Sequence, residues 1–277
     1  MDTVEKVVHD IKSVKIQGAK QIAVHTLKFL KKFCKKNGFG LKFEVAAKII
    51  EDARPTAVVL HNCIEILKEN RKLKTIDTLL RQLDTSSKKI AKKGSKLIKN
   101  NYKIMTHCHS GEALTIIKQA WKDGKKISVI ATETDPLEQG VKTAKELAKL
   151  KIPVTLITDN AVGFFMPEVD CVIVGSDALR VNGSVNKIGT SLLALAAKKN
   201  KKPFYVAADL FKLDRRKKFV IEERSEKEVY KELLHPGKLK GIKIRNPAFD
   251  VTNWKFVSIV ITEKGVLKPN KILRLLK

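Results

Sequence analysis

The stretch KIMTHCHSGEALTIIKQAWKDGKKISVIAT, residues 103–132, decides the fold. It contains two short apolar runs, 103–105 and 127–131, and between them residues 111–121 repeat apolar side chains at helical intervals. Apolar runs this short and continuous are typical of strands that are buried on both faces. A strand–helix–strand unit of this kind predicts a parallel sheet covered by helices.

The same alternation continues to the end of the chain, with apolar runs at 154–157, 171–174, 204–207 and 256–261 and helical segments at 143–150 and 189–199. The first 100 residues differ, because apolar residues recur there at three- and four-residue intervals over 4–14, 22–33, 43–51, 57–67 and 76–83. The Lys-rich segment 86–100 predicts a connecting helix. We therefore expect an α/β protein with an N-terminal helical domain (1–100) followed by a Rossmann-like domain (101–277) with a mainly parallel sheet.

Composition excludes several classes of protein. The chain has 277 residues and carries 56 Lys and Arg against 29 Asp and Glu, a net charge of +27. The basic residues are spread over the chain and the Lys-rich segment has no aromatic residue for stacking, so a nucleic-acid partner is not expected. No apolar run is long enough for a membrane span. The N-terminal stretch MDTVEKVVHDIKSVK has no signal-peptide hydrophobic segment either, so we expect a cytoplasmic protein. The four cysteines form no CxxC pair, which argues against a disulfide framework.

Polar residues follow each of the six predicted strands, at 106–111, 132–136, 158–160, 175–177, 208–212 and 262–265. Ligands of open parallel sheets bind outside the carboxyl ends of the strands. One such ending is explained by helix capping alone. Six endings at one edge predict a binding site, in which Glu133 and Asp209 either contact substrate hydroxyls or only tie loops together.

Two of these loops suggest a phosphorylated ligand. Cys108 precedes Ser110 and Gly111, where a helix is predicted to begin, and a helix N-terminus binds phosphate and lowers the pKa of a nearby thiol. Residues 186–191 predict a second anion cradle beside Lys187, and Lys212 adds positive charge. A bisphosphorylated small molecule fits this arrangement. A zinc site at 107–109 is disfavoured, because alternating residues do not face one way, and no Gly-rich dinucleotide fingerprint is present, so neither a metal nor a cofactor is expected.

Several ordered motifs resemble one known family. They are KIQGA (15–19), ARPTA (53–57), THCHSG (106–111), ATET (131–134), VGSDALRVNGSVNKIGT (174–190), AADLFK (207–212), NPAFDVT (246–252) and ITEKG (261–265). They are similar to the family that contains ribose-1,5-bisphosphate isomerase, methylthioribose-1-phosphate isomerase and the regulatory subunits of translation initiation factor 2B. The resemblance covers most of the chain and is greatest to the ribose-1,5-bisphosphate isomerases.

The resemblance implies aldose–ketose isomerisation of ribose 1,5-bisphosphate to ribulose 1,5-bisphosphate in nucleotide (AMP) salvage, by an archaeal homo-oligomer, dimer or hexamer, with a nucleotide as an activator. It implies that Cys108 and Asp177 are the catalytic pair. It implies that the substrate contacts Gly18, Ala19, Arg54, His107, Ser110, Glu133, Gln139, Asn186, Lys187 and Lys212. The alternative is a non-catalytic regulatory subunit that binds a sugar phosphate or nucleotide.

Two positions depart from the family pattern. Gln17 and Asp135 stand where the family usually has Arg, and both changes remove positive charge. A carboxylate about 4 Å from a phosphate would be repelled by roughly 4 kcal/mol at an effective dielectric constant near 20. We therefore expect Asp135 to point away from the substrate or to be paired.

Overall fold

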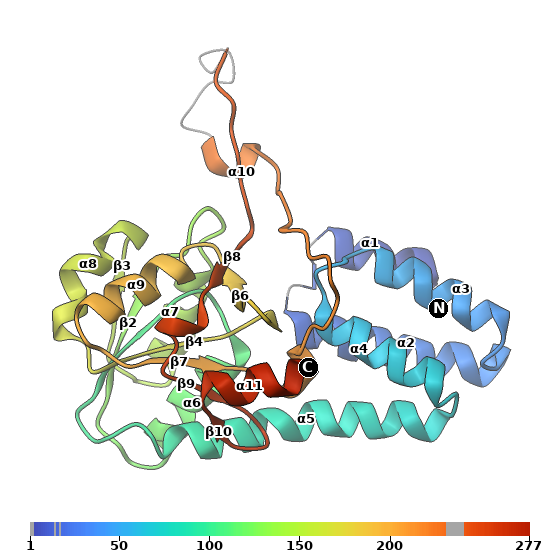
Figure 1. Ribbon diagram of the computed structural model, residues 1–277, viewed down its shortest axis with the longest axis horizontal. Coiled ribbons are helices and arrows are strands. Elements are labelled where there is room, and N and C mark those ends of the chain that lie inside the picture. Colours follow the sequence, from blue (N-terminus) through green and yellow to red (C-terminus); the bar gives the residue numbers. More distant parts are fainter. Residues whose placement is uncertain (1–2, 14, 17, 231–240) are drawn as a thin grey trace.

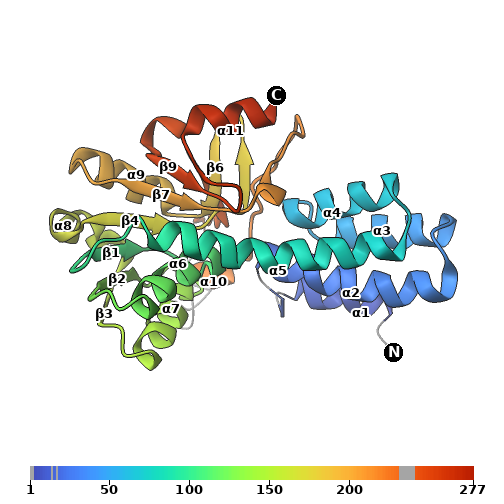
Figure 2. The same cartoon turned by 90° about the horizontal axis from the view of Figure 1, so that it is seen from below.

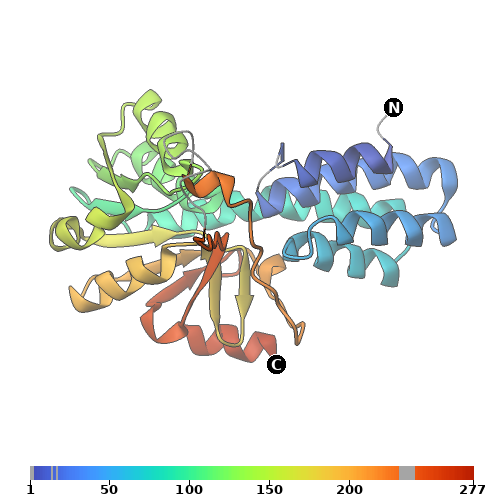
Figure 3. The ribbon, with the colours of Figure 1, turned by 90° about the horizontal axis from the view of Figure 1, so that it is seen from above.

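The computed structural model describes residues 3–13, 15–16, 18–230 and 241–277, so Gln17 lies outside the described residues. Helices pack together at one end of the molecule and a sheet with its covering helices forms the other (Figures 1 and 3). No helix in the described part of the chain is long and apolar enough to cross a membrane.

The helical end comprises five helices. They are α1 (Val4–Lys12), α2 (Ala19–Asn37), α3 (Leu41–Asp52), α4 (Val58–Glu69) and α5 (Leu73–Ser95). Their apolar stripes meet in one core, in which Leu30, Phe43 and Ile64 are fully buried. The described part of the first 100 residues contains no strand, as the periodicity predicts. The separate core supports a domain boundary near residue 100, which we retain as a proposal.

Helix α5 joins the two ends of the molecule (Figure 2). It is one continuous helix where the sequence predicted two helical segments, 76–83 and 86–100. It ends at Ser95, five residues earlier than expected. It packs against α2 at one end and against α6 (Gly111–Lys122) at the other. At Gly94 the contact with α6 is so close that an added Cβ would lie 2.6 Å from side-chain atoms of Ile116.

The main sheet has seven strands in the order β10-β9-β7-β4-β1-β2-β3. The strands are β1 (Lys103–Thr106), β2 (Ser128–Thr132), β3 (Val154–Ile157), β4 (Cys171–Val174), β7 (Phe204–Ala207), β9 (Ile259–Ile261) and β10 (Val266–Leu267). All pairs are parallel except β9 with β10, so the predicted parallel sheet is confirmed. The last predicted strand was too long, because Trp254–Phe256 form a short 3-10 turn, η5, capped by Asn253.

Helices cover both faces of this sheet. Alternate residues of β4 enter two cores: Val172 and Val174 pack with α9 (Thr190–Lys199) and α11 (Pro269–Leu276), whereas Cys171 and Ile173 pack with α6. The remaining helices and turns are α7 (Gln139–Lys149), α8 (Val162–Phe165), α10 (Lys227–Tyr230), η1 (Asp159–Ala161), η2 (Met166–Glu168) and η3 (Leu210–Lys212). Burial on both faces explains the continuous apolar runs.

A second, antiparallel sheet was not predicted. It has the order β5-β6-β8 and consists of β5 (Ala178–Arg180), β6 (Gly183–Lys187) and β8 (Phe249–Thr252). Every residue of β6 is buried, including the polar Ser184, Asn186 and Lys187. This sheet places Asn186 and Lys187 beside the carboxyl ends of the main sheet.

The contact at Gly94 gives a test of how α5 is held. Gly94→Val should lower the free energy of unfolding by about 1–3 kcal/mol, because the added atoms overpack against Ile116. Lys92→Val, an exposed position on the same helix, should cost only about 0.5 kcal/mol. Chemical denaturation measures both. Equal effects of the two substitutions would contradict the close packing of α5 on α6.

Candidate active site

The candidate catalytic pair leaves the sheet at one edge. Strands β1 and β4 are parallel neighbours, so the loops that follow Thr106 and Val174 emerge at the same end. The first loop carries Cys108 and the second carries Asp177, whose backbone N–H donates to the carbonyl of Val185 on β6 (2.7 Å). Neighbouring carboxyl ends of parallel strands are where ligands of such sheets bind.

Cys108 is held in an uncommon backbone conformation. Its φ is +67°, in the left-handed region that residues other than glycine rarely adopt. Two threonines fix it there: its N–H donates to Oγ1 of Thr134 (2.8 Å), and its carbonyl accepts from Oγ1 of Thr143 (2.8 Å). Strained residues held by their surroundings are typical of functional sites. The sequence placed Thr134 in a site loop (132–136) without assigning it this role, and Thr143, which lies in a predicted helical segment, was missed.

The predicted lowering of the Cys108 pKa is wrong. Helix α6 begins at Gly111 as expected, with Ser110 as its cap accepting from the N–H of Ala113 (3.3 Å). Burial nevertheless raises the pKa of the Cys108 thiol to about 11, and the Lys187 ammonium only partly opposes it. The thiol is therefore protonated at neutral pH in the free protein.

Asp177, which follows the buried strand β4, also has a raised pKa. Burial raises the pKa of its carboxyl, against the opposing charges of Lys212 and Arg54, and Glu112 raises it further. The same environment thus favours the proton-bearing form of both Asp177 and the Cys108 thiol. A pair of proton-bearing groups of different acidity is suited to general acid–base chemistry.

Three basic side chains lie near this pair. Lys187, at the end of β6, is buried and its pKa is lowered by burial, while the charges of Cys108 and Asp177 act to raise it. Lys212, on η3, is buried with its ammonium 2.9 Å from Oε1 of Glu112. Arg54, in the turn between α3 and α4, has Nε 3.4 Å from Oε2 of Glu222. The helical end of the molecule therefore contributes a cation to the site.

His107 does not have a free ring nitrogen. Its Nε2 is 2.8 Å from the carbonyl of Ile188 and must donate, so Nδ1 accepts from Oγ1 of Thr132 (2.6 Å). Burial also lowers the pKa of His107, in keeping with a neutral ring. His107 connects the ends of β1 and β2 to the loop at Ile188, and its contact with substrate stays a prediction.

The predicted anion cradle at 186–191 is already occupied by a protein carboxylate. Asp250 Oδ2, from β8, accepts from the N–H groups of Gly189 (2.9 Å) and Ser191 (3.0 Å). Asn186 is buried and donates its amide to Oγ1 of Thr190 (3.0 Å). Positive charge at this place comes from the Lys187 side chain, and those two backbone donors are not available to a ligand.

The remaining predicted substrate residues lie at the starts of helices or after a strand. Gly18 and Ala19 open α2, Glu133 follows β2, and Gln139 opens α7. The pKa of Glu133 is raised by burial and by Asp135. Gln139 is buried, and its Oε1 has no hydrogen-bond partner among the described residues. An unsatisfied buried acceptor of this kind is open to a ligand donor.

Asp135 lies in the loop after β2, beside Asp159. It is exposed, and its backbone N–H donates to Oδ2 of Asp159 (2.7 Å). The charges that most affect the pKa of Cys108 are Lys187, Asp177 and Asp159. Those that most affect Asp177 are Lys212, Arg54, Glu112 and Lys187. That Asp135 points away from the substrate or is paired stays a prediction.

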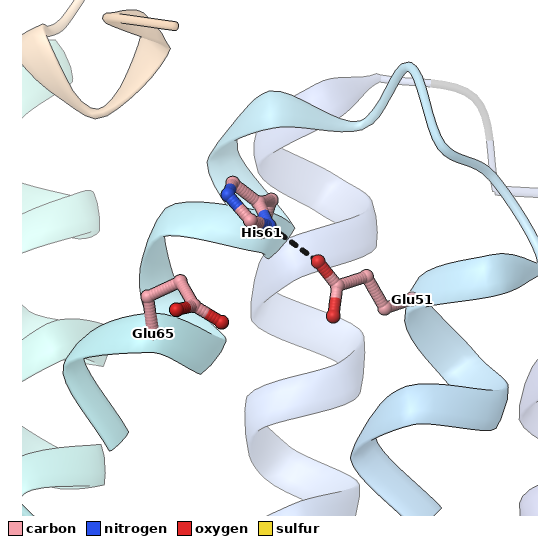
Figure 4. Close-up of side chains that lie close together, drawn as sticks. All are labelled: Glu51, His61 and Glu65. Atoms are coloured by element: carbon pink, nitrogen blue, oxygen red, sulfur yellow. Dashed lines mark hydrogen bonds and ion pairs between the residues drawn. The ribbon is translucent and has the colours of Figure 1, made fainter. Parts of the chain in front are cut away.

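One cluster of metal-ligand type lies away from this site, in the helical end. Glu51 at the end of α3 hydrogen-bonds Nδ1 of His61 on α4, and Glu65 lies one turn further along α4 (Figure 4). Nζ of Lys68 is 3.8 Å from Oε2 of Glu51 and 2.6 Å from Oε1 of Glu65. The Lys68 side chain pairs with both carboxylates, so we interpret the cluster as an ion-pair network.

The Cys108 environment predicts how the thiol reacts. The iodoacetamide alkylation rate should rise with pH toward a pKa of about 11, because only the thiolate reacts. Lys187→Met should slow alkylation at pH 8 about tenfold, equivalent to one pKa unit, whereas Lys122→Met on the exposed end of α6 should not. Mass spectrometry of the native protein measures the rate at Cys108, since Cys34, Cys63 and Cys171 are buried. A plateau in rate near pH 7 would contradict this environment.

Comparison with known proteins agrees with the resemblance drawn from the motifs. The model of the Initiation factor 2 subunit family matches residues 15–269. The ribose 1,5-bisphosphate isomerase of Archaeoglobus fulgidus is 41% identical over 97% of this chain and 91% of its own length. The ribose 1,5-bisphosphate isomerase of Methanocaldococcus jannaschii is 42% identical over 97% of this chain and 92% of its own length.

The fold of this chain is also similar to that of solved structures from the same family. The crystal structure of the translation initiation factor eIF-2B of Pyrococcus horikoshii OT3 matches with a TM-score of 0.84 at 30% identity, covering 98% of each chain. Sequence and fold therefore identify this chain as a member of the Initiation factor 2 subunit family, similar over nearly its whole length to ribose 1,5-bisphosphate isomerases.

Proposed function

We propose that the protein is a sugar-phosphate isomerase that converts ribose 1,5-bisphosphate to ribulose 1,5-bisphosphate, in nucleotide salvage. One observation carries the proposal: a thiol and a carboxyl, both with raised pKa, stand beside three basic side chains at one edge of the sheet. The similarity to proteins named for this activity supports the same substrate.

The reaction needs one group for a carbon-bound proton and another for an oxygen-bound proton. Asp177 donates its proton to the ring oxygen as the bond from that oxygen to C1 breaks. Cys108, in its minor thiolate form, removes the proton from C2, which gives an enol phosphate that keeps the phosphate on the C1 oxygen. The Asp177 carboxylate then takes the proton from the C2 oxygen, and the Cys108 thiol returns its proton to C1. The Lys187 ammonium favours the thiolate, because it lowers the pKa of Cys108.

The basic side chains suit a substrate with two phosphates. We place one phosphate near Lys187 and the other near Arg54 and the start of α2, with Lys212 closer to the reacting oxygens. The N-terminus of α2 supports this placement, because helix starts bind phosphate through free N–H groups. Since Asp250 takes the donors at the start of α9, the Lys187 end depends on side-chain charge.

Turnover of ribose 1,5-bisphosphate, followed by phosphorus and carbon NMR, tests the proposal. Cys108→Ser and Asp177→Asn should each lower kcat by about 10²–10⁴-fold, the usual contribution of a general acid or base. Asp123→Asn, an exposed carboxyl at the end of α6, should leave kcat unchanged. Binding of the sugar phosphate without turnover by the unaltered protein would favour the regulatory alternative.

We also propose that the protein is a homo-oligomer that associates through the sheet end. Helices α8 and α9 are in contact, and they expose Phe164 (78%), Leu192 (60%) and Leu195 (46%). This apolar patch lies on the sheet end of the molecule (Figure 1). Contiguous exposed apolar residues are typical of protein interfaces. A second copy is the occupant that the family resemblance implies.

Light scattering after size exclusion tests this interface. The double substitution Leu192→Glu and Leu195→Glu should lower the molar mass to that of one chain, because two carboxylates would be buried on association. Leu41→Glu, which alters an exposed leucine in the helical end, should leave the mass unchanged. An unchanged mass in the double variant would show that copies associate elsewhere.

Two further partner and location predictions remain open to test. A nucleotide activator would fit a cavity of about 520 Å³ between α4, α5 and η3. Asn62, Lys89 and Phe211 are among the residues that line it. The cavity shares η3 with Lys212, so a ligand there would contact the turn that carries this lysine. A cytoplasmic location stays a prediction, with which the four free cysteines are in keeping.

A further inference from the structure

Asp159 follows β3 and uses both oxygens of its carboxylate to hold the backbone of the neighbouring loop. Its Oδ1 accepts from the N–H of Thr134 (2.9 Å), and its Oδ2 accepts from the N–H of Asp135 (2.7 Å). Hydrogen bonds from backbone N–H groups to a carboxylate are stronger than those to a neutral acceptor. Asp159 therefore fixes the path of the chain through the loop that follows β2.

Thr134 has the same uncommon backbone conformation as Cys108. Its φ is +65°, and a β-branched residue is a clear exception in this left-handed region. Glycine adopts such angles at little cost, so glycine is expected where only the shape of the turn matters. Threonine supplies a hydroxyl that glycine lacks, and its Oγ1 accepts from the N–H of Cys108 (2.8 Å). The unfavourable backbone at Thr134 thus accompanies a side chain that holds the candidate catalytic residue.

The three residues form a series of hydrogen bonds across neighbouring strand ends. Cys108 follows β1, Thr134 follows β2 and Asp159 follows β3, and these strands are adjacent and parallel in the main sheet. Thr134 is fully buried, whereas the Asp159 side chain is 34% exposed. Strained conformations persist only where the surrounding structure holds them. Asp159 supplies that support for Thr134, and Thr134 supplies it for Cys108.

We propose that Asp159 is a positioning residue for the Cys108 thiol: it fixes the left-handed turn at Thr134, which places the threonine hydroxyl within hydrogen-bond distance of the Cys108 N–H. The value of this positioning for catalysis rests on the proposed isomerase function. The positioning itself does not, because the hydrogen bonds belong to the folded chain. Oδ1 of Asp159 is 3.8 Å from Nδ1 of His107, beyond hydrogen-bond distance, so the route to Cys108 runs through Thr134.

Amide exchange in protein labelled with nitrogen-15 at cysteine tests the positioning directly. The chain has four cysteines, and the Cys108 signal is identified by its loss in Cys108→Ser. In Asp159→Ala the Cys108 amide should exchange with solvent about tenfold faster, which corresponds to the loss of about one hydrogen bond of typical strength. The amides of Cys34, Cys63 and Cys171 should exchange at unchanged rates.

Two results of this experiment would overturn the proposal. One is an unchanged exchange rate at Cys108. The other is equal acceleration at all four cysteines, which would show a general loss of stability. Asp159→Asn covers the case in which the alanine variant does not fold: its amide oxygen still accepts one N–H, so the Cys108 rate should rise by only about threefold. No rise in the asparagine variant would count against the proposal in the same way.

Asp170→Ala is the matched control. Asp170 also accepts from a backbone N–H with its carboxylate, that of Lys103 at the start of β1 (2.7 Å). It therefore holds the opposite end of the strand that leads to Cys108. The substitution should leave amide exchange at Cys108 unchanged. Faster exchange there would show that Cys108 responds to any loosening of β1, which would also overturn the proposal.

Turnover separates positioning from a structural role. If the protein isomerises ribose 1,5-bisphosphate, Asp159→Ala should lower kcat by about 10–100-fold with little change in KM, because a displaced thiol slows proton transfer without weakening phosphate binding. Thr134→Val, which replaces the hydroxyl by a methyl group, should also lower kcat. Thr134→Ser, which keeps the hydroxyl, should largely retain it. A raised KM with unchanged kcat in Asp159→Ala would refute the catalytic role.

The double variant that combines Asp159→Ala with Thr134→Val shows whether the two residues act in series. If Asp159 acts through the threonine hydroxyl, kcat of the double variant should equal that of Thr134→Val, since residues that share one route are not additive. Losses that multiply would show a separate route and contradict the proposal. Absence of turnover by the unaltered protein would refute the proposed function, while amide exchange would still decide how Asp159 acts on Cys108.

Discussion

The parallel pairing of β1 with β4 is the constraint on which the candidate active site depends. Because the two strands run side by side in one direction, Cys108 and Asp177 leave the sheet at the same edge although 69 positions separate them in the chain. The other contributors reach that edge from elements outside the main sheet: Lys187 from the small sheet and Arg54 from the helical end. An antiparallel arrangement of the two strands would place the thiol and the carboxyl at opposite edges.

Much of this arrangement could be predicted from the sequence, because its signals are local. The six short apolar runs predicted the parallel strands. The polar residues after these runs predicted a binding site at the carboxyl ends of the strands. The small sheet could not be found this way. Strand β6 buries Ser184, Asn186 and Lys187, so its residues lack the apolar pattern of a core strand, and its partner β8 lies about 60 residues later.

The electrostatic character of the site was the least predictable part. The position of Cys108 before a helix suggested a thiolate, but burial decides the sign of its pKa shift, and burial depends on elements far away in the sequence. The sequence predicted an anion site at the start of α9, but the Asp250 carboxylate from β8 accepts the hydrogen bonds of two N–H groups there. The backbone partner of His107, Ile188, lies 81 positions away. Each correction reflects a long-range contact that no local pattern encodes.

Asn62 on α4 shows how the two ends of the molecule depend on each other. Its amide donates to the carbonyls of Phe211 (2.7 Å) and Leu213 (2.8 Å), the residues on either side of Lys212. The helical end therefore holds the backbone of a residue in the sheet end's site. As a consequence, the two ends are not interchangeable modules. A chimera that took its first 100 residues from another family member would keep Lys212 in register only if the donor helices also supplied an amide at this place.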